Sequence, residues 1–186
     1  MSQKKIIGIY FLLFLLACGN SQPPPTESTV QVQVAENEDD LLVSLASELI
    51  SNPRTQAEKD KNALLNYMMD KGIALTPTES GLYYQMIEEG TGEMAVWGDW
   101  VTVNYKGYTL DGKVFDSSYK KGKPIQFYIG NMIAGWNEGL ELMRAGGKAL
   151  FLVPSGLAYG EKGFPNVIEP NTPLAFEVEL LKIEQK

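Results

Sequence analysis

The spacing of apolar residues changes character twice along the chain. Residues 6–16 form an almost continuous apolar run that only Gly8 interrupts. Between residues 41 and 71 the apolar positions recur every three or four residues, which is the period of an amphipathic helix. Beyond Gly81 the period falls toward two, which is typical of β-strands. The pattern therefore predicts a leader, a helical segment and a sheet domain, in that order.

The helical segment predicts two helices. Leucines recur at helical spacing after an acidic run at 38–40, and the helix dipole favours acidic residues at an N-terminus. Asn52-Pro53 should end this first helix, because the residue before proline disfavours the helical conformation. A second helix should run from about Arg54 to Lys71 and end at Gly72, a residue suited to the C-terminal cap.

Neither helix carries a charge pattern or motif that indicates chemistry. One interpretation is that they pack against the main domain or act as a short spacer, and the other is that they form a dimerisation arm. We favour the first interpretation, and a monomer, because two modest helices offer little surface for a stable interface of about 1,600 Å².

Five segments predict strands, and a short helix lies among them. The strands are 82–88, 100–109, 125–129, 148–153 and 174–183. Leu110-Asp111-Gly112 is a hairpin signal, and the short helix should span Trp136 to Arg144 and end at Gly146-Gly147. We therefore expect an α+β fold, in which a curved antiparallel sheet of about five strands wraps on one short helix and is preceded by two N-terminal helices.

The first eighteen residues indicate an export signal. Lys4 and Lys5 precede the apolar run, which is too short for a membrane span of about 20 apolar residues and fits a signal peptide. The run ends in Leu15-Leu16-Ala17-Cys18, and Cys18 is the single cysteine of the chain. This ending resembles the bacterial lipobox, in which the cysteine is diacylated and becomes the new N-terminus. The alternative is an ordinary secretory signal with a chance cysteine.

These features predict four segments and a location. We expect a lipoprotein signal peptide over 1–17, a disordered Pro/Ser/Gln-rich linker over 18–35, a helical arm over 36–80 and the sheet domain over 81–186. The lipid would tether the chain to the membrane of a bacterial cell envelope. No aspartate follows Cys18, which favours the outer membrane, with the protein facing the periplasm.

Composition and charge exclude several functions. The formal net charge is −7, and removal of the signal segment would leave 14 basic and 23 acidic residues, so we expect no nucleic-acid partner. The chain has no histidine, which excludes Ser-His-Asp and Cys-His catalysis and almost all catalytic zinc sites. We expect no metal and no cofactor. Ser117 or Ser118 beside Lys120 is weak grounds for a Ser-Lys hydrolase, and Gly90-Thr91-Gly92 is too short for a phosphate loop.

Five motifs in one order resemble the FK506-binding-protein (FKBP) family over about residues 81–186. The motifs are Val103-Asn104-Tyr105-Lys106-Gly107-Tyr108, Asp111-Gly112-Lys113-Val114-Phe115-Asp116-Ser117-Ser118, Ile133-Ala134-Gly135-Trp136-Asn137-Glu138-Gly139, Leu157-Ala158-Tyr159-Gly160 and Phe176-Glu177-Val178-Glu179-Leu180-Leu181. The helical lead-in also resembles bacterial members with an N-terminal helical arm, the macrophage-infectivity-potentiator type.

The resemblance implies a peptidyl-prolyl cis/trans isomerase with an aromatic pocket whose floor is Trp136. Its implied catalytic residues are Tyr105, Phe115, Asp116, Trp136, Tyr159 and Phe176. Its implied substrate-binding residues are Phe127, Met132, Ile133, Phe164 and Ile168. Without the resemblance, the aromatic residues would be interpreted as core and Asp116 as a turn cap. Lys121 stands where the family often has an arginine paired with the aspartate, and we expect it to be a solvated cation.

The implied role is a membrane-tethered folding catalyst for exported proteins. Its partners would be proline-containing polypeptide clients, and macrocyclic inhibitors would bind the same pocket. An alternative from another class is a chaperone or protein-binding module that keeps the FKBP fold with little or no isomerase activity. A third hypothesis is a structural lipoprotein that takes part in assembly.

Overall fold

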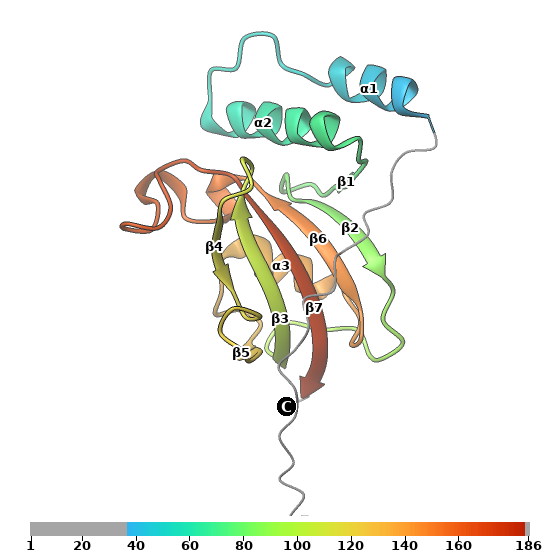
Figure 1. Cartoon of the computed structure of the whole chain (residues 1–186), viewed down its shortest axis with the longest axis vertical. Helices are drawn as coiled ribbons and strands as arrows, with labels where there is room; N and C mark the ends of the chain where they lie inside the picture. The colour runs from blue at the N-terminus through green and yellow to red at the C-terminus, as the bar shows by residue number, and fades with distance from the viewer. Residues whose placement is uncertain (1–36, 185–186) are drawn as a thin grey trace, which may run out of the picture.

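The computed structural model describes residues 37–184, which form three α-helices and a seven-stranded antiparallel sheet (Figure 1). The predicted α+β fold is confirmed. The signal peptide, the linker and Cys18 lie outside the described residues, so those predictions stay predictions.

The elements follow one another in a simple order. The helices are α1 (Glu38–Ser47), α2 (Gln56–Lys71) and α3 (Ala134–Glu141), and the 3₁₀ turns are η1 (Ser155–Leu157) and η2 (Gly160–Lys162). The strands are β1 (Thr76–Pro77), β2 (Tyr83–Glu88), β3 (Trp100–Thr109), β4 (Val114–Ser117), β5 (Ile125–Tyr128), β6 (Lys148–Val153) and β7 (Leu174–Glu184). The sheet order is β1-β2-β6-β7-β3-β4, and β5 also pairs with β3.

Both arm helices begin and end at identifiable capping residues, although α1 is shorter than predicted. Thr55 and Glu58 form a capping box at the start of α2, and Gly72, with φ of 62°, ends it as predicted. Helix α1 ends at Ser47, before the predicted stop at Asn52-Pro53. The side chain of Asn62 accepts from the backbone N–H of Ile50 at 2.9 Å and donates to the Ile50 carbonyl at 2.8 Å. These bonds hold the residues that follow α1 out of the helix.

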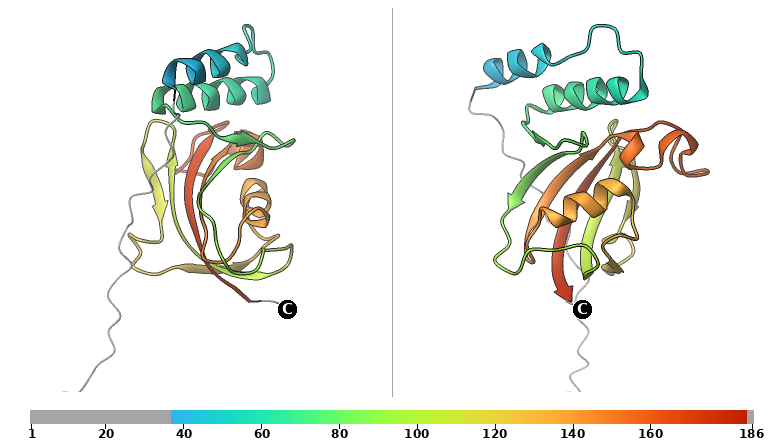
Figure 2. Two further views of the ribbon diagram at one scale, coloured as in Figure 1. Left: turned by 90° about the vertical axis from the view of Figure 1, so that its right-hand side faces the viewer. Right: turned by 180° about the vertical axis from the view of Figure 1, so that it is seen from behind.

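Helix α2 packs over one end of the sheet, and α1 lies on the outer side of α2 (Figure 2). Leu64, Leu65 and Met68 of α2 are fully buried, and they share a cluster with Leu150 and Leu152 of β6. The neighbouring residues along β6 point into the other cluster, beneath α3, because side chains alternate between the two faces of a strand. The arm therefore completes the core of the sheet domain.

Strand β3 pairs with three other strands that carry pocket residues. It pairs with β7 along its whole length, and on its other edge it pairs first with β5 and then with β4. The five predicted strands are present, whereas β1 and β4 were not predicted. Strand β1 has two residues and β4 has four, with a register shift against β3, and such short segments show no alternation. The predicted hairpin is confirmed, with Gly112 at φ of 89°.

Helix α3 lies against the inner face of the sheet, close to β6 (Figure 2). A Cβ on Gly135 would lie 2.5 Å from Val153, and one on Gly139 would lie 2.8 Å from the ring of Phe151. The two glycines therefore allow the close approach that brings α3 onto the sheet. The helix ends at Glu141 rather than the predicted Arg144, because the chain tightens there into i→i+3 bonds.

We predict that Gly139→Ala destabilises the fold despite the better helix propensity of alanine. The new methyl group would overlap the buried ring of Phe151, and overpacking of a core costs about 1–3 kcal/mol. Gly156→Ala is the control, because a Cβ at that position meets nothing within 4 Å. Urea unfolding followed by circular dichroism should show a lower midpoint for Gly139→Ala alone. Equal midpoints for the two variants would contradict the close-approach explanation.

Candidate active site

A buried tryptophan and three other aromatic rings form the centre of the site. Trp136, on α3, is 2% exposed. Its ring centroid lies 5.1 Å from that of Tyr105 and 5.4 Å from that of Phe176, both nearly perpendicular to it, and 5.7 Å from that of Phe127. These partners come from β3, β7 and β5, so the close packing of α3 onto the sheet assembles the cluster. Edge-to-face ring pairs of this kind stabilise their arrangement beyond simple burial.

A small pocket of about 60 Å³ opens above this cluster. It is lined by Tyr105, Phe115, Asp116, Met132, Ile133, Trp136, Tyr159 and Phe176. All six residues predicted to be catalytic are among them. The ring of Phe115 packs edge-on against Phe176, with centroids 5.7 Å apart, and closes one wall.

Of the five predicted substrate-binding residues, Met132 and Ile133 line the pocket. The other three lie around it. Phe127 is buried behind Trp136. Phe164 is half exposed and packs on the ring of Tyr159, with centroids 5.6 Å apart. Ile168 is buried and pairs through the backbone with Phe164. Phe164 and Ile168 therefore pack beside Tyr159 at the rim and do not form the pocket lining.

Three polar side chains meet at the edge of the pocket. The hydroxyl of Tyr105 donates to Oδ2 of Asp116 at 2.5 Å, and Lys121 Nζ lies 2.5 Å from Oδ1 of the same carboxylate. Lys121 also donates to the Tyr105 hydroxyl at 3.2 Å. Lys121 is thus paired with the aspartate, although its side chain stays half exposed, as expected of a solvated cation. The turn between β4 and β5 folds back and carries Lys121 to the aspartate. Asp116 also accepts from the N–H of Ser117 at 2.8 Å, so it stabilises the turn as well.

The surroundings of these groups fix their protonation states. Burial and the bond to Asp116 raise the pKa of Tyr105 to about 12, with Lys121 opposing the shift. Burial, followed by the charge of Asp116, raises the pKa of Tyr159. Partial burial alone would raise the pKa of Asp116, but hydrogen bonds from Lys121 and Tyr105 outweigh it and lower that pKa. At neutral pH the pocket therefore holds two protonated phenols beside one carboxylate; Tyr105 donates its proton to Asp116, and Tyr159 is the phenol that can donate to a ligand.

We predict that Lys121→Met raises the pKa of Asp116. The variant removes the hydrogen bond and the positive charge of the lysine, while the burial that raises this pKa remains. In the parent, the stability contributed by the carboxylate is complete above its unfolded pKa of about 3.9 and is lost as the pH falls through its lower folded-state pKa. In Lys121→Met the folded-state pKa lies closer to the unfolded value, so this contribution should be smaller and should be lost completely at a higher pH.

The carboxyl carbon of Asp116, followed by NMR titration, reports this pKa directly. Lys121→Arg is the control, since it keeps the positive charge and should keep the low pKa. An unchanged titration midpoint in Lys121→Met would show that the lysine does not set the protonation state of the aspartate.

Two polar residues that hold the pocket were not predicted from the sequence. Ser118 is fully buried, and its hydroxyl accepts from the backbone N–H of Tyr105 at 2.9 Å. The side chain of Asn137 accepts from the N–H groups of Gly130 and Met132 and donates to the carbonyl of Met132. Ser118 thus fixes the strand that carries Tyr105, and Asn137 fixes the loop that leads to Met132. Both residues lie inside the family motifs, and that position is the sequence feature that could have identified them.

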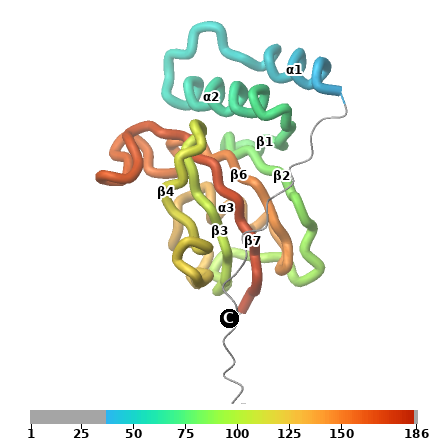
Figure 3. Tube along the Cα trace, viewed as in Figure 1, coloured from blue at the N-terminus to red at the C-terminus, as the bar shows by residue number. Residues whose placement is uncertain are grey.

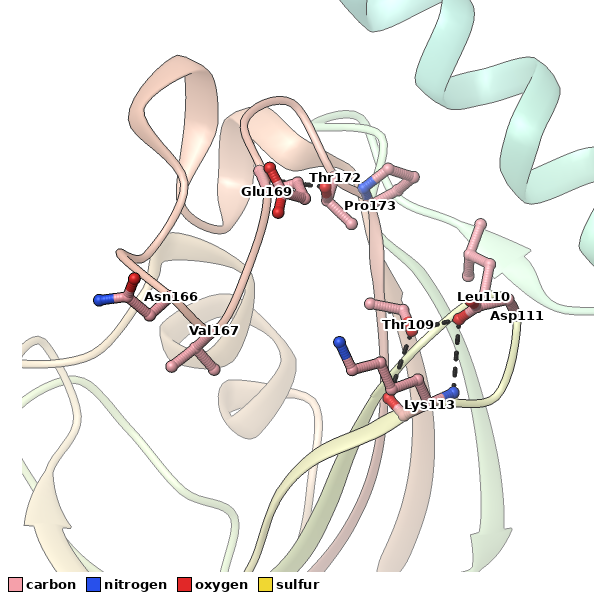
Figure 4. Close-up of a pocket in the computed structure, with 9 residues that line it drawn as sticks. All are labelled: Thr109, Leu110, Asp111, Lys113, Asn166, Val167, Glu169, Thr172 and Pro173. Atoms are coloured by element: carbon pink, nitrogen blue, oxygen red, sulfur yellow. Dashed lines mark hydrogen bonds between the residues drawn. The ribbon is translucent and has the colours of Figure 1, made fainter.

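A wider hollow of about 500 Å³ lies beside the tip of the β3–β4 hairpin (Figure 4). It is lined by Thr109, Leu110, Asp111, Lys113, Asn166, Val167, Glu169, Thr172 and Pro173. On the hairpin side, the carboxylate of Asp111 already accepts from the Thr109 hydroxyl and from the N–H of Lys113. None of the aromatic pocket residues lines this hollow. We therefore place the candidate site at the aromatic pocket, where rings and ionisable groups converge.

Two further properties concern only residues 37–184. Within that range, no group of three or more acidic or cysteine side chains is arranged to hold a metal ion. None of the helices in the same range is long and apolar enough to cross a bilayer.

Known proteins are similar to this chain in both sequence and fold. FkpA of Escherichia coli strain K12, named as an FKBP-type peptidyl-prolyl cis-trans isomerase, is 44% identical over 126 residues, which are 68% of this chain and 46% of FkpA. The crystal structure of E. coli FkpA matches with a TM-score of 0.63 and 37% identity, covering 79% of this chain and 64% of that one. The chain thus spans about half the length of the FkpA sequence.

Two other relatives match over most of the chain. A probable FKBP-type peptidyl-prolyl cis-trans isomerase of Haemophilus influenzae is 36% identical over 166 residues, which are 86% of this chain and 69% of that protein. The outer membrane protein MIP of Legionella longbeachae is 37% identical over 162 residues, which are 86% of this chain and 68% of that protein. Residues 92–181 match the family described as FKBP-type peptidyl-prolyl cis-trans isomerase. The chain belongs to this family.

Proposed function

We propose that the protein catalyses cis/trans isomerisation of peptide bonds that precede proline in polypeptide clients. The observation that carries this proposal is the pocket over Trp136, enclosed by aromatic rings and edged by Asp116 and the hydroxyls of Tyr105 and Tyr159. Its apolar lining fits the hydrocarbon ring of proline, and its polar groups lie to one side, where they can meet the peptide backbone.

The reaction needs no nucleophile. Resonance makes the peptide bond planar, and the barrier to rotation is about 18–20 kcal/mol. The twisted transition state loses this resonance, and its carbonyl is less polar than that of the planar ground state. An apolar pocket that excludes water therefore disfavours the planar state relative to the twisted one, which is catalysis by differential stabilisation. This mechanism is compatible with a chain that has no histidine.

The polar groups would orient the substrate rather than exchange protons with it. The hydroxyl of Tyr159 stays protonated because its pKa is raised, and it can donate to a substrate carbonyl. Asp116 and Lys121 hold the hydroxyl of Tyr105 at the edge of the pocket. Holding the proline in one orientation adds to the rate, because less freedom must be lost in the transition state.

An assay on a proline tetrapeptide separates this proposal from the chaperone alternative. We expect the purified chain to accelerate isomerisation, and Asp116→Leu to lower kcat/KM because it removes the carboxylate that holds Tyr105. A parent chain that prevents aggregation of an unfolded protein but leaves the isomerisation rate unchanged would favour the chaperone. Full activity in Asp116→Leu would exclude Asp116 from the site.

We further propose that the protein acts on exported clients while anchored to the bacterial cell envelope by a lipid on Cys18. The support is the charged start, the short apolar run and the lipobox-like ending of the sequence, together with a relative, the Legionella protein, whose name places it in the outer membrane. More than one acyl chain is needed for stable anchoring.

Cys18→Ser should move the protein from the membrane fraction to the soluble fraction of the cell. The reason is that serine has no thiol to carry the lipid, while the rest of the chain is unchanged. Fractionation followed by immunoblotting checks the prediction, with Ser21→Ala in the same segment as the control. Failure of the parent chain to incorporate labelled palmitate would rule out the lipid anchor.

A further inference from the structure

A buried carboxylate joins the helical arm to the framework of the pocket. Asp60, on α2, is 2% exposed. Its Oδ2 accepts from the backbone N–H of Ser155 at 2.7 Å and from the Ser155 hydroxyl at 2.6 Å, and its Oδ1 accepts from the amide of Gln56 at 2.7 Å. A buried charged group is costly unless it is hydrogen-bonded, and here both carboxylate oxygens are. The contact is thus an interior feature of the fold.

The residue that Asp60 holds begins the turn leading to Tyr159. Ser155 is 1% exposed and opens η1, in which the N–H of Ala158 donates to the carbonyl of Ser155 at 3.0 Å. Tyr159 follows directly and lines the pocket. Because a single tight turn separates the two residues, a displacement of Ser155 is passed on to the Tyr159 side chain.

The turn is not fully packed on the side that faces the arm. A hollow of about 370 Å³ lies there, with residues of α2, η1 and η2 in its lining. Figure 3 shows α2 passing over the start of the segment that runs from η1 toward β7. On this side of the turn, the side-chain hydrogen bonds that hold η1 are those from Ser155 to Asp60.

A second polar contact links the segment after the arm to the same framework. The hydroxyl of Ser80 donates to the carboxylate of Glu138 at 2.7 Å, two residues beyond Trp136 on α3. This contact is exposed and should contribute little to the free energy of folding. It nevertheless connects the segment between α2 and β2 to α3, the helix that carries Trp136.

We propose that Asp60 is a positioning residue: its carboxylate holds η1 in place and thereby keeps Tyr159 at the pocket. The inference rests on the proposed function for its effect on catalysis, and it makes the helical arm part of the isomerase unit. Tyr159 would bind the substrate carbonyl in ground and transition states alike, so its misplacement should raise KM more than it lowers kcat.

Three substitutions separate the hydrogen bonds from packing and from helix stability. Asp60→Leu keeps the branched shape and the number of heavy atoms but leaves Ser155 without its acceptor, whereas Asp60→Asn keeps one oxygen that can accept both bonds. Asp70→Leu makes the same change at an exposed position of the same helix. Each variant is assayed on a proline tetrapeptide well below its unfolding temperature.

Asp60→Leu should raise KM by about ten-fold with little change in kcat, because it weakens one hydrogen bond that the substrate would make equally in the ground and transition states. Asp60→Asn and Asp70→Leu should stay near the parent KM. A parent-like KM in a folded Asp60→Leu variant would overturn the inference, and so would a KM raised equally in Asp70→Leu.

Hydrogen exchange at residues 155–159 provides a test that does not depend on catalysis. Asp60→Leu should accelerate exchange there more than in β6, and Asp60→Asn should not. If the parent chain shows no isomerase activity, the proposed function fails, and the exchange result still decides whether Asp60 positions the turn. Unchanged exchange in Asp60→Leu would refute that role.

Discussion

Trp136→Ala should lower kcat/KM for a proline tetrapeptide by at least about 100-fold, since each tenfold loss of rate corresponds to about 1.4 kcal/mol. The variant removes the pocket floor and three ring contacts, and such ring pairs are worth about 0.5–1.5 kcal/mol each beyond burial. The remaining void would also let water reach the peptide carbonyl, which would weaken the preference for the twisted state.

The folded state of this variant must be established before its activity is interpreted, because truncating a buried tryptophan costs about 3–5 kcal/mol. Trp136→Phe keeps a ring in the floor and should lose much less activity. Activity is measured at a temperature at which circular dichroism shows both variants to be folded. Parent-like turnover in folded Trp136→Ala would remove the tryptophan from the catalytic site.

Leu64→Ala should lower the free energy of unfolding by about 2–5 kcal/mol, the usual cost of truncating a buried leucine. Leu64 is fully buried between α2 and the sheet, where its neighbours include β6 residues that also support the pocket. For a folded unit of this size, each kcal/mol lowers Tm by about 2–4 °C. Scanning calorimetry should therefore show a clearly lower Tm in one transition.

Leu42→Ala is the matched control, because Leu42 lies in the same arm but is 40% exposed. Its effect should stay within about 0.5 kcal/mol of the parent, as for most surface substitutions. If the arm were an independent spacer, Leu64→Ala would unfold the arm in a separate, lower transition and leave the Tm of the sheet domain unchanged. That result would contradict the shared core.

Regular elements of the fold could be predicted where the polarity pattern was long enough. Strands β3 and β6 have the predicted bounds, since β3 partly alternates over ten residues and β6 is a short apolar run between Gly147 and Pro154. Strand β4 could not be found in this way, since four residues cannot define a period and its register against β3 shifts. Helix α3 was predicted, but with displaced ends, because its last turn tightens through bonds that polarity does not reveal.

The residues of the site were predicted from the order of motifs rather than from physical pattern. Periodicity alone would assign Trp136 and Phe176 to the core, and both are indeed buried while also lining the pocket. The contact of Asp60 could not be predicted from the sequence, whereas the pairing of Lys121 with Asp116 was available from the resemblance, in which a paired arginine often holds that position. Asp60 meets Ser155 across 95 positions of sequence, a contact that only the packing of the arm creates.

Exchange between cis and trans forms of a proline tetrapeptide, followed at equilibrium by NMR, tests the central claim most directly. The method needs neither a protease nor a refolding protein, so it reports only rotation about the peptide bond. Uncatalysed exchange takes tens of seconds or more. We predict that a catalytic amount of the parent chain brings exchange into the sub-second range and that Trp136→Ala abolishes this acceleration. An exchange rate that the folded parent chain leaves unchanged would contradict the assignment of the pocket as an isomerase site.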